Sequence, residues 1–298
     1  MEKNIQYSST SAHWPKPRLL LIGCGDIGMR LLPRLTQIYR VFALIREPSR
    51  APSIRALGAV PLLGDLDQPA SLWRLGSLAS YVLHLAPPAL DGVLDQRTRN
   101  LCHILPATRR LVYVSTSGVY GDCGGVRINE SQAVHPVNAR AKRRVDAEKT
   151  LRAWARRTGS SLAIIRVPGI YAQDRLPLAR LEKQLPALLP EQDVYTNHIH
   201  AEDLAHILLH ALFKARSNRI YHAVDDSEMK MGEYFDAVAD SLGFARPPRL
   251  PRAEIEQVLS PAMLSFMSES RRLNNQRIKQ ELGVRLHFPT VASALAKV

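Results

Sequence analysis

The sequence has 298 residues, of which 46% are hydrophobic, and its 40 lysines and arginines against 27 acidic residues give a formal charge of +13. Such a chain suits one large α/β domain, with or without a smaller lobe, and excludes collagen-like, low-complexity and wholly disordered proteins. No apolar stretch approaches the roughly 18 residues that span a bilayer, and the polar N-terminus lacks a secretory signal. Three scattered cysteines make no disulfide framework. We therefore expect a cytoplasmic protein without a membrane partner.

The charge of +13 is compatible with a nucleic-acid partner, an anionic ligand or a solvated basic surface. Many of the basic residues gather in residues 140–157, where Trp154 is the one aromatic side chain. No DNA-reading motif accompanies them. A solvated helix face is therefore the favoured interpretation, and no nucleic-acid partner is expected.

Apolar runs alternate with helical patterns along the first half of the chain. Residues 1–17 are expected to form a flexible tail, because Pro15 and Pro17 delay regular structure. The predicted strands are 19–22, 41–45, 59–63, 81–85, 111–114 and 161–166, and the predicted helices include 27–38, 97–105 and 139–157. This alternation predicts an α/β fold with a doubly wound parallel sheet, whose ligands bind at the carboxyl ends of the strands.

Beyond Pro168 the alternation weakens, although a helix from about Glu202 and a strand at 220–224 are still predicted. The last third contains several helical pieces separated by prolines. We assign 18–170 to a dinucleotide-binding domain. We assign 171–298 to a region that contributes late sheet strands and a small, mostly helical substrate lobe.

A glycine-rich loop follows the first predicted strand directly and opens the first helix. Its G-x-G-x-x-G pattern consists of Gly23, Gly25 and Gly28. The first glycine permits a tight turn, the second lets the backbone approach a pyrophosphate, and the third allows close helix–sheet packing. Free N–H groups at the helix start hold phosphates. We expect a Rossmann-type NAD(P) site at these glycines and at Asp26 and Ile27.

The end of the second predicted strand bears on the choice of cofactor. An acidic residue there binds the ribose hydroxyls of NAD. Arg46 stands at this position instead, and Arg50 is close enough to share a 2′-phosphate. These arginines favour NADP(H). Glu47 is the competing feature, so NAD remains the alternative.

Several segments, in this order, resemble the extended short-chain dehydrogenase/reductases, the NAD-dependent epimerase/dehydratase group. They are Gly64-Asp65-Leu66, His84-Leu85-Ala86-Pro87, the serine-rich segment 112–121 ending in V-Y-G, Arg166-Val167-Pro168-Gly169-Ile170-Tyr171 without the family's final G-P, and the segment 197–204. The resemblance covers nearly the whole chain from Arg18. It implies dinucleotide contacts at Asp65, Leu66, Ala86 and Pro168, and a helix at 139–157 that often lines a homodimer interface.

The family's chemistry uses a hydroxyl, a tyrosine and a lysine four residues after that tyrosine. The hydroxyl position falls on Thr116, but no tyrosine lies between Gly121 and Tyr171. One register places Asn138 and Lys142 on the tyrosine–lysine pair. The other places Arg140 and Arg144 there, aligns Glu148 with a family glutamate, and is preferred because its spacing from Thr116 is closer to the family's.

Neither register supplies a phenol, and arginine stays protonated near neutral pH. This departure resembles the atypical branch of the family, which keeps the cofactor fold but loses the catalytic pair. Replacement by Tyr120, Tyr171, His198 or His200 is conceivable, but the two tyrosines are expected to pack structurally. The candidate catalytic residues are therefore Thr116 and either Arg144 or Lys142, with Arg144 also a cofactor contact.

Histidines 198, 200, 206 and 210 suggest a metal site, since His206 and His210 share a helical face. The zinc-protease pattern needs a glutamate directly after the first histidine, and Ile207 stands there. No metal is therefore expected. The predicted function is an NAD(P)-binding oxidoreductase or epimerase of the epimerase/dehydratase type, acting on a small, sugar-linked substrate. The alternative is a non-catalytic NADP(H)-binding sensor or regulatory protein.

Overall fold

The computed structural model describes residues 15–297, so most of the predicted tail lies outside the described residues. Seven parallel strands form one sheet in the order β12-β7-β5-β4-β1-β2-β3. The strands are β1 (Arg18–Ile22), β2 (Arg40–Ile45), β3 (Val60–Leu63), β4 (Tyr81–His84), β5 (Arg110–Thr116), β7 (Leu162–Val167) and β12 (Arg219–His222). The predicted α/β fold with a parallel sheet is confirmed, and its strand order reverses between β1 and β4.

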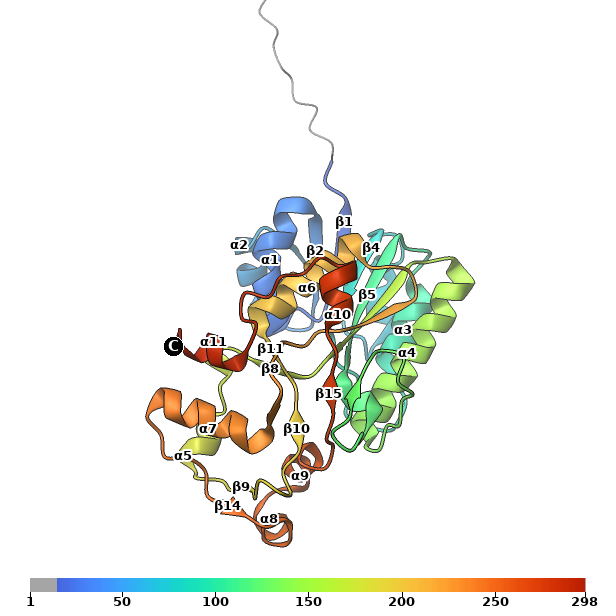
Figure 1. Ribbon diagram of the computed structural model, residues 1–298. Helices are drawn as coiled ribbons and strands as arrows, with labels where there is room; N and C mark the ends of the chain where they lie inside the picture. Colours follow the sequence, from blue (N-terminus) through green and yellow to red (C-terminus); the bar gives the residue numbers. More distant parts are fainter. Residues whose placement is uncertain (1–14, 298) are drawn as a thin grey trace, which may run out of the picture.

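Helices cover both faces of the sheet (Figure 1). One face packs against α1 (Asp26–Ile38), α2 (Ala51–Ala56), α6 (Ala201–Lys214) and α10 (Gln276–Glu281). The other packs against the 3₁₀ segment η2 (Pro69–Leu75), α3 (Gln96–Ile104) and α4 (Ala139–Thr158). The central strands read as continuous apolar runs because both of their faces are buried. None of the helices described in residues 15–297 has the length and apolar character needed to cross a membrane.

Two helices show how local chemistry sets their limits. Helix α1 runs through Pro33 without interruption. Pro33 removes one backbone hydrogen bond, and the burial of Leu31 and Leu35 on the sheet offsets that loss. Helix α4 starts where the Asn138 side chain accepts the N–H of Ala141, and it ends at Gly159 in the left-handed region.

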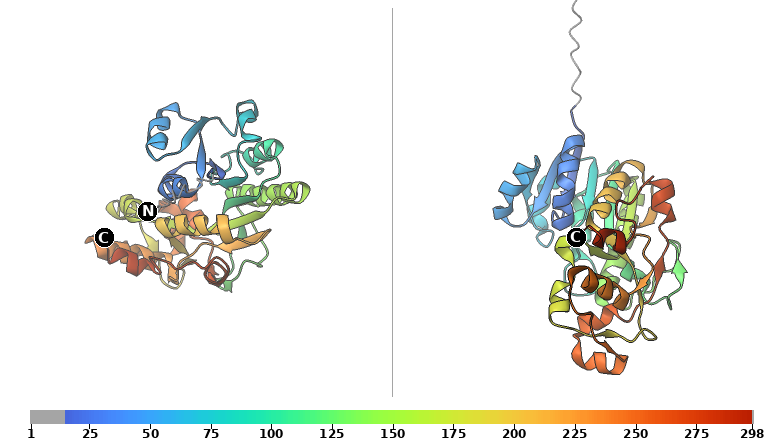
Figure 2. Two further views of the ribbon diagram at one scale, coloured as in Figure 1. Left: turned by 90° about the horizontal axis from the view of Figure 1, so that it is seen from above. Right: turned by 60° about the vertical axis from the view of Figure 1, so that its left-hand side comes forward.

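The remaining elements are short and build a lobe at the end of the sheet where the strands terminate (Figures 1 and 2). They are β6 (Arg127–Ile128), β8 (Gly169–Tyr171), η4 (a 3₁₀ turn, Gln173–Arg175), α5 (Leu178–Glu182), β9 (Ala187–Leu188), β10 (Tyr195–Thr196), β11 (His198–His200), β13 (Met229–Lys230), α7 (Met231–Leu242), β14 (Arg249–Leu250), α8 (Arg252–Val258), α9 (Pro261–Phe266), β15 (Arg272–Leu273) and α11 (Val291–Leu295). Two further 3₁₀ turns belong to the sheet half: η1 (Pro48–Arg50) adjoins α2, and η3 (Ser117–Tyr120) contacts α4. The lobe has its own apolar core, which includes Leu181, Val238 and Ile255.

Candidate functional site

A cavity of about 260 Å³ lies at the carboxyl ends of β1 to β4. Its lining residues include Gly23, Gly25, Arg46, Arg50, Asp65, Leu66 and Ala86. Residues that the sequence assigns to the dinucleotide thus meet in one hollow. In the described part of the chain the lining does not include Asp26, Ile27 or Gly28. Asp26 begins α1 and accepts hydrogen bonds from Arg30 (2.9 Å) and Arg175 (2.7 Å).

The two glycines of this loop that line the cavity do different work. Gly23 has a φ of +83°, and a Cβ added there would lie 2.4 Å from the backbone nitrogen of Ala86. Only glycine fits this turn from β1 into α1, because the segment that follows β4 packs directly against it. At Gly25 an added Cβ would meet nothing within 4 Å. The open space above Gly25 is where a ligand's phosphates can reach the backbone.

Gly23→Ala is expected to destabilise the fold, because the backbone of Ala86 would have to move, and a strained left-handed alanine alone costs about 1–3 kcal/mol. Gly25→Ala should leave the fold intact and weaken dinucleotide binding through its new methyl group. Chemical denaturation gives the free energy of unfolding and calorimetry gives the affinity. The assignment is wrong if Gly25→Ala binds the cofactor as tightly as the wild type.

The basic residues after β2 act on the cavity. Arg50 lies near the phosphate loop, where its charge opposes the effect of burial on Cys24; burial dominates and raises the pKa of that thiol to about 11. Cys24 therefore stays protonated and packs as a small apolar residue. The charge of Arg46 contributes to the lowered pKa of Asp67, after the stronger effect of the Arg97 hydrogen bond. Glu47 is exposed and is not among the lining residues described for this cavity.

A second cavity, of about 420 Å³, lies where β5 and β7 end and the lobe begins. The sheet side contributes Thr116, Ser117, Gly118 and Pro168, α4 contributes Arg140, and the lobe side contributes Arg175, Tyr195, Asn197, Met231, Phe266, Glu269 and Arg271. The Thr116 hydroxyl oxygen accepts the N–H of Gly118 at 3.2 Å, at the start of a 3₁₀ turn. Its own O–H remains available to donate to a substrate oxygen.

The candidate residues of the two α4 registers lie in different surroundings. Arg140 lines the second cavity, with its guanidinium carbon 4.6 Å from the ring centre of Phe266. Arg144, one turn further, donates to the Tyr113 hydroxyl (2.9 Å) and to the Val114 carbonyl (2.8 Å), just before Thr116. Lys142 is exposed and is not among the residues described as lining this cavity. Arg140 and Arg144 therefore occupy the face of α4 that looks toward the end of β5.

Glu148 connects α4 to the sheet through a buried ion pair. Its carboxylate accepts hydrogen bonds from the Arg166 Nε (3.1 Å) and Nη2 (2.6 Å) atoms and from the Ser115 hydroxyl (2.6 Å). Both side chains of the ion pair are almost fully buried. This pair joins α4 to β5 and β7 directly beneath Thr116, so it holds the strand ends that form the floor of the cavity.

Comparisons with known proteins show to which family this architecture belongs. The family model described as the RmlD substrate binding domain matches residues 100–297. A functionally unknown conserved protein from Silicibacter pomeroyi has 30% sequence identity and a TM-score of 0.78, over 94% of this chain and 97% of its own. This chain belongs to the extended short-chain dehydrogenase/reductase family. Its group is that of the NAD-dependent epimerases and dehydratases.

Two enzymes of known activity share the fold. A UDP-glucose 4-epimerase from Thermotoga maritima, solved with UDP-glucose, is 16% identical with a TM-score of 0.73, over 93% of this chain and 96% of its own. A double mutant of dTDP-glucose 4,6-dehydratase from Streptomyces venezuelae, solved with NAD, is 21% identical with a TM-score of 0.75, over 94% and 96%. A search of curated proteins found no match.

The first turns of α4 are where a short-chain dehydrogenase/reductase carries its catalytic tyrosine, and this chain has none there. The side chains considered as replacements have other surroundings. Tyr120 is fully buried, and its hydroxyl lies 2.5 Å from the Nε2 atom of His222. Tyr171 donates to Asp225 at 3.1 Å. Burial lowers the pKa of His198 to about 3, so this imidazole stays neutral. The two tyrosines are thus engaged in hydrogen bonds, and the His198 ring stacks on Tyr234.

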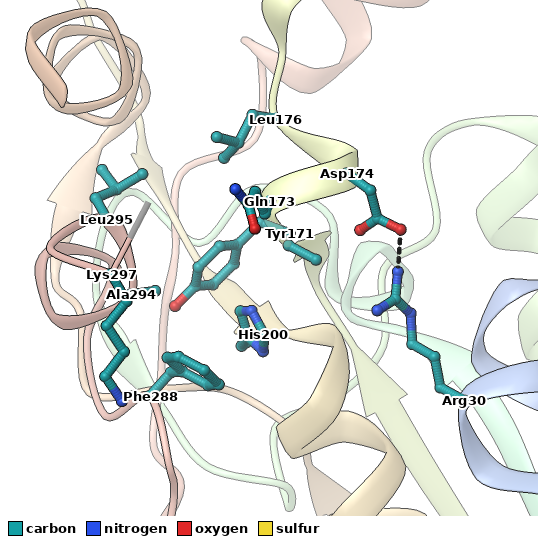
Figure 3. A pocket seen from close by; sticks show the side chains of 11 residues that line it. Arg30, Tyr171, Gln173, Asp174, Leu176, His200, Phe288, Ala294, Leu295 and Lys297 are labelled. Atoms are coloured by element: carbon teal, nitrogen blue, oxygen red, sulfur yellow. Dashed lines mark hydrogen bonds and ion pairs between the residues drawn. The ribbon is translucent and has the colours of Figure 1, made fainter. Parts of the chain in front are cut away.

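Tyr171 and His200 line a third cavity, of about 430 Å³ (Figure 3), and none of its described lining residues is shared with the Thr116 cavity. Phe288 and Lys297 of the C-terminal segment complete its wall. Sequence reasoning missed the lobe residues of the Thr116 cavity, above all Tyr195. No motif marks it, and it reaches the cavity only because the lobe folds back on the sheet.

Proposed function

We propose that this protein is an NADP(H)-dependent oxidoreductase or epimerase that acts on a small, anionic, sugar-linked substrate. One observation carries the proposal: Arg46 and Arg50 line the same cavity as Gly23 and Gly25, at the sheet edge that also presents Thr116. The cofactor would lie across this edge, with its pyrophosphate at the glycine loop and its nicotinamide directed toward Thr116. When bound, the nicotinamide supplies hydride transfer.

The second cavity supports a substrate of this class. Arg140, Arg175 and Arg271 line it, so it favours an anionic group such as a phosphate. Glu269 pairs with Arg271 at 2.7 Å and leaves a surplus of positive charge. The related epimerase was solved with UDP-glucose, an anionic sugar-linked compound. Thr116 would donate a hydrogen bond to the reacting oxygen, and Tyr195 provides a phenol within the same lining.

Thr116→Ala is expected to lower turnover of a carbonyl substrate by at least about tenfold, because one hydrogen bond to the reacting oxygen is lost. NADPH affinity should stay within about twofold, because the hydroxyl lies outside the glycine-loop cavity. Steady-state kinetics and calorimetry measure the two effects. Thr196→Ala, which removes a neighbouring hydroxyl from the same cavity, is the matched control. If Thr116→Ala is as active as Thr196→Ala, this hydroxyl has no role in the reaction.

A second candidate function is a non-catalytic NADP(H) sensor, and Arg144 favours it. Its guanidinium stands at the lysine position but is committed to Tyr113 and to the backbone of β5. Hydride-transfer assays with NADPH over a panel of carbonyl compounds and sugar nucleotides separate the two functions. Turnover of any member supports the enzyme. Tight NADPH binding without turnover supports the sensor.

A further inference from the structure

A cluster of nitrogen and oxygen ligands lies on the outer side of α6, apart from the cavities described above. It consists of Asp203 and His206 of α6 and His287 of the C-terminal segment. One ligand atom from each of these residues lies within 4.8 Å of the others. We propose that this cluster binds a zinc ion, which fastens the C-terminal segment to α6.

His206 is the central member of the cluster. Its Nδ1 atom is buried and has no hydrogen-bond partner among residues 15–297. A buried ring nitrogen without a partner is costly unless something binds it.

Asp203 and His287 are held together by hydrogen bonds. The fully buried Asp203 carboxylate accepts the His287 backbone N–H (2.8 Å), its ring Nδ1–H (3.1 Å) and the backbone N–H of Phe288 (2.9 Å). The His287 side chain is 60% exposed, so an ion reaches the cluster from solvent. A carboxylate has about four acceptor sites, so these three hydrogen bonds leave one for an ion.

His210 lies one turn after His206 and extends the cluster. The centres of the two rings are 4.4 Å apart. The His210 Nδ1–H donates to the Leu282 carbonyl at 2.9 Å, which leaves its Nε2 lone pair unused by this bond. Donation of one ring N–H to a backbone carbonyl is the usual arrangement of a metal-binding histidine. His210 lies outside the three-residue cluster, and its side chain would have to turn to become a further ligand.

The donor set selects the ion. Imidazole and carboxylate together suit Zn²⁺, whereas Mg²⁺ and Ca²⁺ prefer all-oxygen sites. In the tetrahedral geometry that zinc prefers, ligand atoms each about 2.1 Å from the ion lie about 3.4 Å apart. The cluster would therefore close by up to roughly 1.4 Å on binding, through a rotation of the exposed His287 side chain. Arg34, which pairs with Glu202, is the opposing charge nearby.

The ion would connect two parts of the chain that are 84 residues apart. Phe288, next to His287, packs against His200 in a tilted arrangement with ring centres 3.8 Å apart, and it lines the cavity of Figure 3. Zinc would therefore stabilise this wall of the lobe, because an ion that binds only the folded chain shifts the folding equilibrium toward the folded state. The missing glutamate after His206 does not exclude the site, since its third ligand comes from residue 287.

The test uses the full chain without an affinity tag, with zinc binding measured by calorimetry and the melting temperature measured with and without ZnCl₂. The variants are His206→Ala and His287→Ala. The control is His103→Ala, which removes an exposed histidine from α3. MgCl₂ is the control ion.

The wild type and His103→Ala are expected to bind one zinc ion, and zinc should raise their melting temperature by at least about 2 °C. His206→Ala and His287→Ala should bind zinc at least about tenfold more weakly and lose this rise. If His206→Ala fails to fold, His287→Ala still tests the proposal, because the His287 side chain is largely exposed. The proposal is overturned if excess zinc leaves the wild type unchanged, if both variants bind zinc as His103→Ala does, or if magnesium has the same effect.

Discussion

Arg46→Ala is expected to weaken NADPH binding by about tenfold or more while NADH binding changes by less than about twofold. A hydrogen bond to a charged group contributes about 1.5–3 kcal/mol, and only NADPH carries the 2′-phosphate that Arg46 would bind. Arg46 lines the glycine-loop cavity together with Arg50. Calorimetric titration of both cofactors into wild type and variant measures the difference.

Two further variants make this test specific. Arg55→Ala removes an exposed positive charge from α2 outside the cavity lining, so it should bind both cofactors as the wild type does. The double variant Arg46→Ala/Arg50→Ala should lose more NADPH affinity than Arg46→Ala or Arg50→Ala alone. Equal losses for NADPH and NADH in Arg46→Ala would contradict a 2′-phosphate site and would favour NAD as the cofactor.

Glu148→Ala is expected to lower the free energy of unfolding by about 3–5 kcal/mol, because it leaves the buried Arg166 without its partner. The Arg166 guanidinium donates twice to Glu148, and Ser115 donates a third hydrogen bond to the same carboxylate. Removing the carboxylate leaves all three donors without these hydrogen bonds in the protein interior. Urea denaturation followed by circular dichroism measures the loss.

Two comparisons separate this buried pair from ordinary surface charge. The double replacement of Glu148 and Arg166 by methionine removes both charges and should recover most of the lost stability. Asp240→Ala breaks the exposed pair with Arg246 and should leave the denaturation midpoint unchanged. A Glu148→Ala variant as stable as Asp240→Ala would show that the pair contributes nothing to the fold.

The parallel sheet and the glycine loop were predictable because their patterns are local. A buried parallel strand is a continuous apolar run, and the strand boundaries agree with the structure to within one or two residues. Residues that directly follow such strands share one edge, so the neighbourhood of Gly23, Arg46, Asp65 and Ala86 could be inferred from the sequence. The structure adds that Glu47 stays outside the cavity lining described there.

Other parts of the site depend on contacts that leave no local pattern. The sequence leaves two registers open on α4, and only the folded helix shows that Arg140 lines the cavity while Lys142 is exposed. Tyr171 and His200 seemed possible replacements for the lost tyrosine. They line a different cavity because β8 and β11 pair with each other and turn these side chains toward the C-terminal segment.

The sheet, the glycine-loop edge and the absence of a tyrosine from the expected helix could thus all be inferred from the order of residues. The groups that face that edge became evident only in the folded chain. Arg175, Tyr195 and Arg271 enter the Thr116 cavity from the lobe, and His287 joins His206 from the far end of the chain. The physical reason is that backbone periodicity reports which face of an element is buried, whereas contacts between distant segments depend on side-chain packing across the whole molecule.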